Sequence, residues 1–181
     1  ADNAQNNTIS NNILINNTYT GIELIGYSSR NIIKDNSITD SGYGILCFVE
    51  GGSNTIIENV ISNIEYDGVE IFSDKNFVAK NKIINTGWNG IYLQSSNENT
   101  IIENSLLNIW DTGLVLFKSN NNTVERNTLS DLNTGIRLSH SAGNVLSNNT
   151  ITSINRWKNW MGTAFENSTS NVFVRNSVMK N

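Results

Sequence analysis

Apolar and polar residues alternate along this chain in short runs, and the runs recur in blocks of about two dozen residues. Residues 99–116, NTIIENSLLNIWDTGLVL, show one block: an Asn-x-apolar start, a second asparagine five residues later, and a closing run after Gly113. Alternation with a period of two indicates β-strands rather than helices. A repeat of nearly constant length indicates a solenoid in which each block forms one coil.

Two asparagine positions mark every block. Successive block starts lie 22 to 24 residues apart until a last gap of 27, at Asn7, Asn31, Asn54, Asn76, Asn99, Asn122, Asn144 and Asn171. The asparagine five residues later is Asn12, Asn36, Asn59, Asn81, Asn104, Asn127, Asn149 and Asn176. The pattern predicts an all-β parallel solenoid with three short strands per coil and about seven to eight coils. We expect residues 1–181 to form one domain, with a longer loop inserted at residues 153–162.

Apolar residues in register from block to block define the expected core. The first run contributes Ile9, Ile33, Ile56, Val78, Ile101, Val124, Leu146 and Phe173, and the second contributes Leu14, Ile38, Ile61, Ile83, Leu106, Leu129, Ile151 and Val178. Equivalent residues should lie about 4.8 Å apart on parallel strands. The asparagine column between these runs should stack at a bend and bond to the coils on either side, as asparagine ladders do.

A column of mostly charged residues runs beside this asparagine column. Its members are Asp35, Glu58, Lys80, Glu103, Arg126, Asn148 and Arg175. The sign of the charge alternates from Glu58 to Arg126, and opposite charges on neighbouring strands favour one register. We therefore interpret this column as register control rather than as a catalytic feature.

Composition and charge exclude several classes of partner. The formal charge is -4, and lysine and arginine are scattered, so we expect no nucleic acid partner. No apolar run approaches the roughly 18 residues that a membrane span needs, so we expect no membrane insertion. Proline is absent and about a fifth of the residues are asparagine, which tolerates the left-handed backbone of tight turns.

The closing run of each block carries the candidate binding residues. Its outer face should present Glu23, Leu46, Glu70, Tyr92, Val115 and Arg137, followed two residues later by Ile25, Phe48, Phe72, Gln94, Phe117 and Ser139. Aromatic rings at regular spacing match the apolar faces of sugar rings. The expected substrate-binding residues are Tyr66, Trp88, Tyr92, Trp110, Lys118, Arg137, Trp157 and Trp160. The alternatives are that aromatic residues stack on one another or contact a second subunit.

Three carboxylates are the candidate catalytic residues. Asp67 and Glu70 are close in sequence, and Glu23 should lie two coils from Glu70, ~9.6 Å away by two strand spacings. That separation is close to the roughly 6.5 to 9.5 Å between the carboxylates of an inverting glycosidase. The alternative is structural, because the Asp-Gly pair at Asp67 is also ordinary bend sequence.

Metal ligands are few. The chain has one histidine, His140, one cysteine, Cys47, and two methionines, Met161 and Met179. Copper favours imidazole and sulfur ligands, and Cys47 falls in a core column, where it acts as a small apolar residue. We therefore expect no metal and no cofactor.

Two recurring motifs, Gly-Ile-x-Leu and the segment Ser95–Ile101 (SSNENTI), resemble the repeats of the right-handed parallel β-helix superfamily. The resemblance covers nearly the whole chain and implies a right-handed coil. The superfamily includes carbohydrate-binding proteins, sugar hydrolases, polysaccharide lyases, mannuronan epimerase-like proteins and the copper-associated, periplasmic NosD-like proteins. In its carbohydrate-active members the polysaccharide lies in a cleft along a face of this kind.

The expected function is that of a secreted or cell-surface protein, outside the cytoplasm, that binds polysaccharide or surface glycan on its aromatic and acidic face. Whether it also acts as a hydrolase, lyase or epimerase stays open at this point. The alternative is a structural cell-surface or filament-forming solenoid, whose apolar face and open ends mediate self-assembly into a homo-oligomer or filament.

Overall fold

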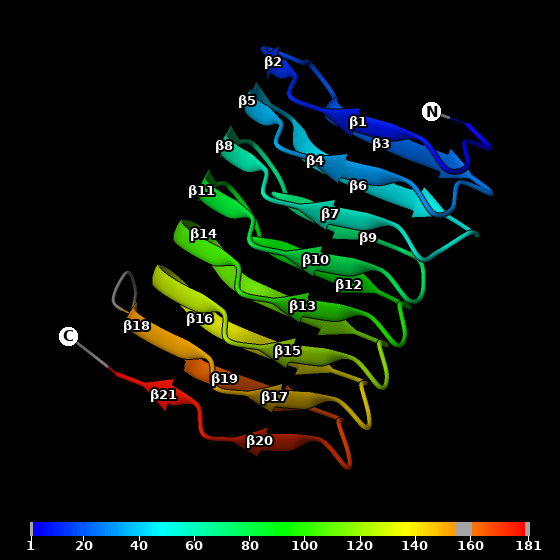
Figure 1. The fold of residues 1–181 in the computed structure, drawn as a ribbon. Helices are drawn as coiled ribbons and strands as arrows, with labels where there is room; N and C mark the ends of the chain where they lie inside the picture. The colour runs from blue at the N-terminus through cyan, green and yellow to red at the C-terminus, as the bar shows by residue number, and fades with distance from the viewer. Residues whose placement is uncertain (1, 155–160, 180–181) are drawn as a thin grey trace.

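The chain winds through successive coils that stack along one axis (Figure 1). This computed structural model describes residues 2–154 and 161–179. Within those residues the chain forms strands, turns and bends without a helix, and the strands of neighbouring coils pair in parallel. The predicted all-β parallel solenoid is confirmed.

Each coil contains up to three strand runs. The first runs are β1 (Thr8–Ser10), β4 (Ile32–Lys34), β7 (Thr55–Ile57), β10 (Phe77–Ala79), β13 (Thr100–Ile102), β15 (Thr123–Glu125), β17 (Val145–Ser147) and β20 (Val172–Val174). The second runs are β2 (Ile13–Ile15), β5 (Ser37–Ser41), β8 (Val60–Ile64), β11 (Lys82–Thr86), β18 (Thr150–Ile154) and β21 (Ser177–Val178). The third runs are β3 (Thr20–Gly26), β6 (Tyr43–Val49), β9 (Val69–Ile71), β12 (Ile91–Gln94) and β19 (Met161–Glu166). Two strands span the second and third runs together, β14 (Ser105–Phe117) and β16 (Thr128–Ser139).

The runs form two hydrogen-bonded sheets. The first runs make an eight-stranded sheet in the order β1-β4-β7-β10-β13-β15-β17-β20. The second and third runs share one larger sheet, because β14 and β16 are continuous through the corner that separates these runs in other coils. The register between β14 and β16 shifts between Ile109 and Thr112, so a bulge absorbs the bend. The three predicted runs are therefore present, with two of them fused in these two coils.

The predicted core columns lie inside the coil. In the central coils Ile33, Ile56, Val78 and Ile101 are completely buried, and they pair directly with one another from strand to strand. In the last coil Phe173 and Val178 keep the predicted register, opposite Leu146 and Ile151, but they are 42% and 45% exposed. The described chain continues the stack on only one side of that coil, so these side chains are covered from one side.

Asparagine side chains link the coils at two corners. At the predicted column, the Asn104 side-chain amide donates to Oδ1 of Asn127 at 3.0 Å and to the carbonyl of Val78 at 2.9 Å. Oδ1 of Asn104 accepts from the backbone and side-chain amides of Asn81 at 2.9 and 3.0 Å. The block-start asparagines form a second ladder of the same kind, as between Asn99 and Asn122 at 3.0 Å. The predicted structural role of the column is confirmed.

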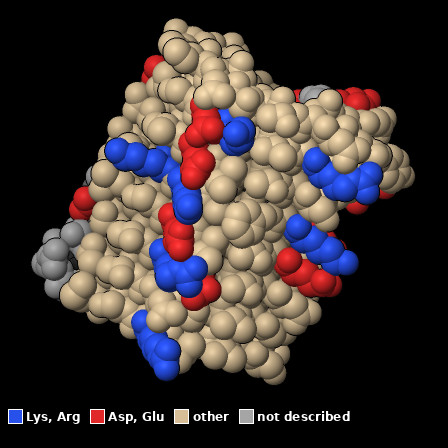
Figure 2. All heavy atoms as spheres, in the orientation of Figure 1, with Lys and Arg blue, Asp and Glu red and all other residues tan. Residues whose placement is uncertain are grey.

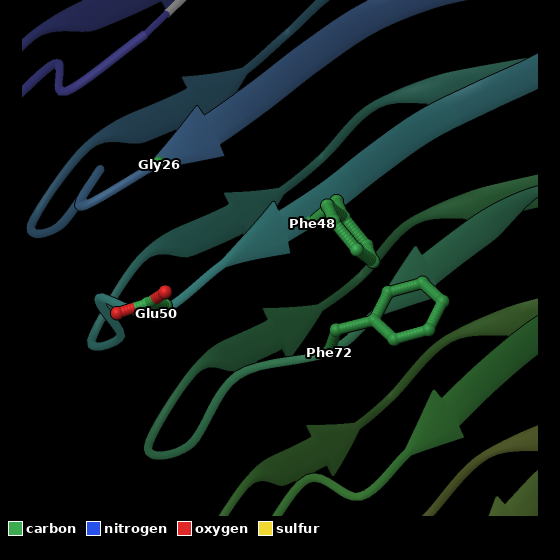
Figure 3. A pocket seen from close by; sticks show the side chains of 4 residues that line it. All are labelled: Gly26, Phe48, Glu50 and Phe72. Carbon is green, nitrogen blue, oxygen red and sulfur yellow. The ribbon is translucent and has the colours of Figure 1, made fainter.

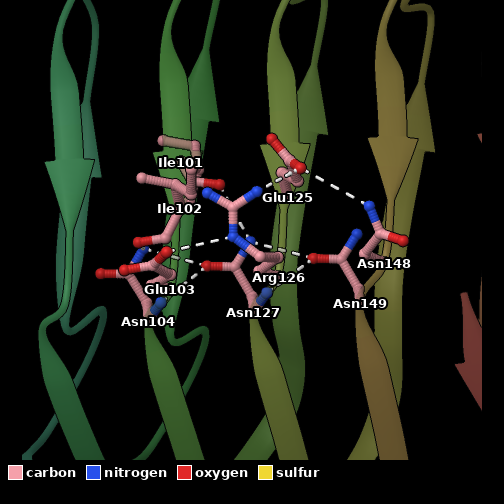
Figure 4. A network of polar contacts seen from close by, with 9 residues as sticks. All are labelled: Ile101, Ile102, Glu103, Asn104, Glu125, Arg126, Asn127, Asn148 and Asn149. Carbon is pink, nitrogen blue, oxygen red and sulfur yellow. Dashed lines mark hydrogen bonds and ion pairs between the residues drawn. The ribbon is translucent and has the colours of Figure 1, made fainter.

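The charged column lies on the surface beside the asparagine ladder (Figure 2). Its residues adopt left-handed backbone, with φ between 52° and 58° from Asp35 to Arg175. Lys80 pairs with Glu58 at 3.9 Å and Arg126 with Glu103 at 3.0 Å (Figure 4). Exposed pairs of this kind contribute little stability each. Their alternation matches the role in register control predicted from the sequence.

Candidate functional site

The outer face of the third runs has the arrangement predicted by parity. Strand register places Glu23, Leu46, Glu70, Tyr92, Val115 and Arg137 in one column. Beside it, Phe117 and Ser139 continue to Glu166 on β19. Glu70 is 8% exposed although it points away from the core.

A groove of about 400 Å³ opens on this face. It is lined by Asn89, Tyr92, Asp111, Thr112, Val115, Phe117, Arg137, Ser139, His140 and Glu166. Tyr92 and Arg137 are sequence-predicted binding residues that the fold brings into the groove. Lys118, a third predicted residue, is exposed at its edge, with Nζ 5.2 Å from the centre of the Phe117 ring. The groove thus combines an apolar floor with charged groups, as binding sites for small polar ligands do.

An ion pair stands at one end of the groove. Nη2 of Arg137 donates to Oε2 of Glu166 at 2.9 Å, and the hydroxyl of Ser139 donates to the same oxygen at 3.3 Å. The hydrogen bond from Arg137 is the main reason that the pKa of Glu166 lies below its ordinary value of 4.5. Oγ of Ser139 also lies 3.0 Å from Nδ1 of His140, which extends the polar cluster. Glu166 is therefore an ionised partner that holds the Arg137 guanidinium.

Asp67 and Glu70 lie next to the groove without lining it. Asp67 is 1% exposed, and its Oδ1 accepts from the backbone and side-chain amides of Asn89, both at 2.8 Å. Burial raises the pKa of Asp67 to about 6, although the Asn89 hydrogen bonds oppose this rise. Burial, and then the charge of Asp67, raises the pKa of Glu70 to about 7. The predicted carboxyl pair is thus close enough to interact, and Glu70 pairs across the strands with Tyr92 of the groove.

Glu23 stands apart from that pair. The strand register puts Leu46 between Glu23 and Glu70, which is the two-coil separation expected from the sequence. Leu46 is 6% exposed and fills the intervening position. Glu23 therefore belongs to the same column as Glu70, two strands away from it.

Aromatic rings stack along the rim that precedes the third runs. Ring centres lie 5.8 Å apart between Tyr19 and Tyr43, 5.0 Å between Tyr43 and Tyr66, and 4.8 Å between Tyr66 and Trp88. Such contacts stabilise neighbouring coils whether or not a ligand is present. Trp88, which contacts Tyr66 in this series, is 51% exposed, so about half of its surface is accessible.

Trp110, another predicted binding residue, does not line the groove. Trp110 is 54% exposed and lines a separate hollow of about 370 Å³ beside Asn85 and Asn108. Trp157 and Trp160 lie outside the described residues. The predicted insertion at residues 153–162 begins within β18 and ends within β19, so residues 161–162 already belong to a strand.

A second, more apolar hollow lies further along the face (Figure 3). It measures about 300 Å³ and is lined by Gly26, Phe48, Glu50 and Phe72. The Phe48 and Phe72 rings meet edge to face with their centres 4.9 Å apart. Phe48 is 59% exposed, so this part of the face presents an aromatic ring to solvent.

Four groove residues escaped the sequence analysis: Asn89, Asp111, Thr112 and Glu166. Glu166 lies within the gap of 27 residues from Asn144 to Asn171, where the repeat length no longer fixes the register. Asp111 lies in the bulge between Ile109 and Thr112, where one strand carries an additional residue. For Asp111 and Glu166, departures from the repeat were the available signal.

Titration of Glu70 should be visible in the pH dependence of stability. Its pKa is 4.5 for an ordinary glutamate and about 7 here, so the folded state binds more protons between these values. The stabilisation that protonated Glu70 gives to the folded state is fully present below pH 4.5. It is lost as the pH rises through about 7. From pH ~5 to pH ~8, wild type should lose about 2 kcal/mol more unfolding free energy than Glu70→Gln. Urea unfolding at several pH values measures this, and equal losses would contradict the raised pKa.

Two family models match the chain. The model described as right handed beta helix region matches residues 46–179. The model described as periplasmic copper-binding protein (NosD) matches residues 1–71. No curated protein sequence matches the chain.

Solved structures share the fold at low sequence identity. The DFA-IIIase from Arthrobacter chlorophenolicus A6 in complex with GF2 is 10% identical with a TM-score of 0.69, over 94% of this chain and 58% of that one. The periplasmic alginate epimerase AlgG is 19% identical with a TM-score of 0.70, over 90% and 51%. Tailspike protein 2 of bacteriophage CBA120 is 13% identical with a TM-score of 0.70, over 90% and 33%. The chain thus spans between a third and three fifths of these structures' lengths, and the likeness concerns the fold.

The residues of the NosD-matched segment do not fit copper. Residues 1–71 contain no histidine or methionine, and their one cysteine, Cys47, is completely buried. Burial raises the pKa of the Cys47 thiol to about 12, which disfavours the thiolate that binds metal. Across the described residues no group of three or more His, Cys, Asp or Glu side chains is arranged to hold a metal ion.

The described residues do not include a helix long and apolar enough to cross a membrane.

Proposed function

Because the chain belongs to the family of right-handed β-helix regions, we propose that it binds polysaccharide in the groove that runs from Asn89 and Tyr92 to Glu166. The observation that carries this proposal is the groove itself, in which an aromatic ring and an apolar floor lie beside hydrogen-bonding groups. Sugars present apolar ring faces edged by hydroxyl groups, and this combination complements both.

The parallel stack suits an extended ligand. Equivalent side chains recur at about 4.8 Å along the axis, so a polymer lying across several coils meets similar positions repeatedly. Trp88 directly precedes Asn89 of the groove, and its side chain is half exposed. The hollow between Phe48 and Phe72 lies on the same face and extends the apolar surface. We assign Tyr92 and Trp88 as sugar-stacking residues, and Arg137 and Lys118 as groups that orient hydroxyls.

The finer part of the proposal is that Asp67 and Glu70 process the bound chain. With a pKa of about 7, Glu70 holds a proton over much of the neutral range, while Asp67, with a pKa of about 6, releases its own more readily. Two carboxyls of unlike proton affinity suit general acid and base roles. In a hydrolysis, Glu70 would protonate the leaving oxygen as the glycosidic bond breaks, and Asp67 would accept a proton from the water that adds to the anomeric carbon. Glu23 would be a distant third carboxylate.

The location that we propose for this function is outside the cytoplasm. The NosD family model is described as periplasmic, and the alginate epimerase AlgG is a periplasmic protein. The three structural relatives include an enzyme named for alginate. These names support a site that meets polysaccharide outside the cytoplasm.

Replacing Tyr92 or Trp88 with alanine should weaken polysaccharide binding about tenfold, because a stacked aromatic ring contributes roughly 1 kcal/mol or more beyond simple burial. The measurement is a titration of labelled oligosaccharides chosen from an array of neutral and acidic glycans. The same samples report hydrolysis as new reducing ends, and Glu70→Gln should abolish their formation.

The matched control is Phe77→Ala, which removes an exposed aromatic ring from β10 on the other sheet. Its glycan affinity should equal that of wild type. The groove would be excluded as the binding site if all three variants bound equally well, and an array without any bound glycan would overturn the proposed function.

A further inference from the structure

The groove and its border hold more carboxyl groups than permanent cations. Asp111 and Glu166 line it, and Asp67 and Glu70 lie beside it. Asp111 is near enough to Asp67 for its charge to raise the pKa of that buried carboxyl. Among the described lining residues, Arg137 is the one lysine or arginine, and Lys118 stands at the edge over Phe117. Even with Glu70 protonated, the three other carboxyl groups, Asp67, Asp111 and Glu166, outnumber the two cations Arg137 and Lys118, so the field in the groove is unfavourable to an anion.

The orientation of Arg137 strengthens this conclusion. Its Nη2 donates to Oε2 of Glu166 at 2.9 Å, and Glu166 is fixed in turn by the Ser139 hydroxyl at 3.3 Å. A guanidinium recognises a carboxylate by directing its N–H groups at the two oxygens. In this groove the protein itself supplies the carboxylate. A carboxylated sugar would have to displace Glu166 and then lie beside its charge.

We infer that Glu166 sets the substrate class of this site: by pairing with Arg137 it makes the groove select uncharged polysaccharide over polymers of uronic acids. The inference rests on the proposed function, because it concerns the same groove. Arg137 then serves neutral sugars by donating N–H groups that are not directed at Glu166 to their hydroxyls. Glu166 is a specificity-determining residue in this scheme and takes no part in bond breaking.

The test uses pairs of probes that differ in charge alone. Fluorescent glucan, galactan and mannan oligosaccharides are titrated beside the same oligosaccharides oxidised at C6, which converts primary hydroxyls to carboxylates. Wild type should bind the neutral member of a pair more tightly. Glu166→Gln keeps the side-chain shape and frees Arg137, so the neutral-to-oxidised affinity ratio should fall about threefold to tenfold. The gain for the oxidised probe should fade as salt is added, because the contact is exposed.

Two further variants test whether the change in the affinity ratio comes from the ion pair between Arg137 and Glu166. Glu103→Gln removes a carboxylate from Arg126 on the register column, away from the groove, and should leave the ratio unchanged (Figure 4). Arg137→Met leaves Glu166 without its cation and should raise the ratio above the wild-type value. This second groove variant also tests the inference if Glu166→Gln proves poorly folded.

The outcomes distinguish failure of the inferred charge selectivity from failure of the proposed polysaccharide binding. Tighter binding of oxidised probes by wild type, or an unchanged ratio in Glu166→Gln, would overturn the inference while leaving polysaccharide binding intact. If wild type bound neither the neutral nor the oxidised member of any probe pair, both the proposed function and this inference would be wrong.

Discussion

Replacing Asn104 with alanine is expected to lower the free energy of unfolding by about 3 to 5 kcal/mol, because several buried polar groups lose their partners together. Asn104 is 1% exposed and accepts from both amide groups of Asn81. Its own amide donates to the carbonyl of Val78 and to Asn127. Alanine reproduces none of these bonds, and water cannot reach the corner readily to replace them.

Urea unfolding followed by circular dichroism measures the loss at Asn104. The control is Asn85→Gly in the exposed ladder, where the side-chain amide donates to Asn63 at 3.0 Å. Asn85 has a φ of 57°, which glycine adopts without strain, so this change should cost less than about 1 kcal/mol. Equal costs at the two sites would show that the buried ladder is not the stronger link between coils.

Replacing Gly68 with alanine is expected to cost about 3 kcal/mol, because the added methyl group has no room. A Cβ atom there would lie 2.5 Å from Cγ2 of Ile83 and 2.7 Å from the carbonyl oxygen of Gly90. The Gly90 oxygen belongs to the backbone of the next coil and cannot move without disturbing its ladder. Glycine at this position lets the corner of one coil approach the next one closely.

Thermal and urea unfolding of Gly68→Ala, compared with Ser37→Ala, measure this cost. Ser37 is an exposed residue of β5, so its truncation should change stability by no more than about 0.5 kcal/mol. A variant at Gly68 that is as stable as the Ser37 variant would mean that neighbouring coils can separate locally at little cost.

The fold was predictable because each coil repeats the same local sequence pattern. Asn104 and Ile101 recur in equivalent form in nearly every block, and each coil contacts only its neighbours, so one correct alignment gives the whole stack. The column predicted the direction in which Phe173 faces but not its exposed fraction of 42%, because a column does not show whether another coil covers the residue.

The candidate site was predictable only in part, because binding surfaces arise where the repeat is broken. Tyr92 and Arg137 obey the strand parity and were found, whereas Asp111 lies in a bulge and Glu166 lies within the longer gap of the repeat. Spacing also could not distinguish rings that contact one another, such as Tyr66 and Trp88, from rings facing a ligand. Side-chain packing across coils decides that distinction, and a one-dimensional pattern does not contain it.

The alternating charges of the register column also constrain how such a chain can change length. Loss of the single coil that carries Lys80 would place Glu58 directly against Glu103. Loss of two consecutive coils, those of Lys80 and Glu103, would instead bring Glu58 beside Arg126 and preserve an attractive neighbour. In this part of the molecule, deletion or duplication of coils in pairs is therefore electrostatically neutral, whereas an odd number is penalised. The charges of the register column between Glu58 and Arg126 thus favour a change in coil number by an even number over a change by an odd number.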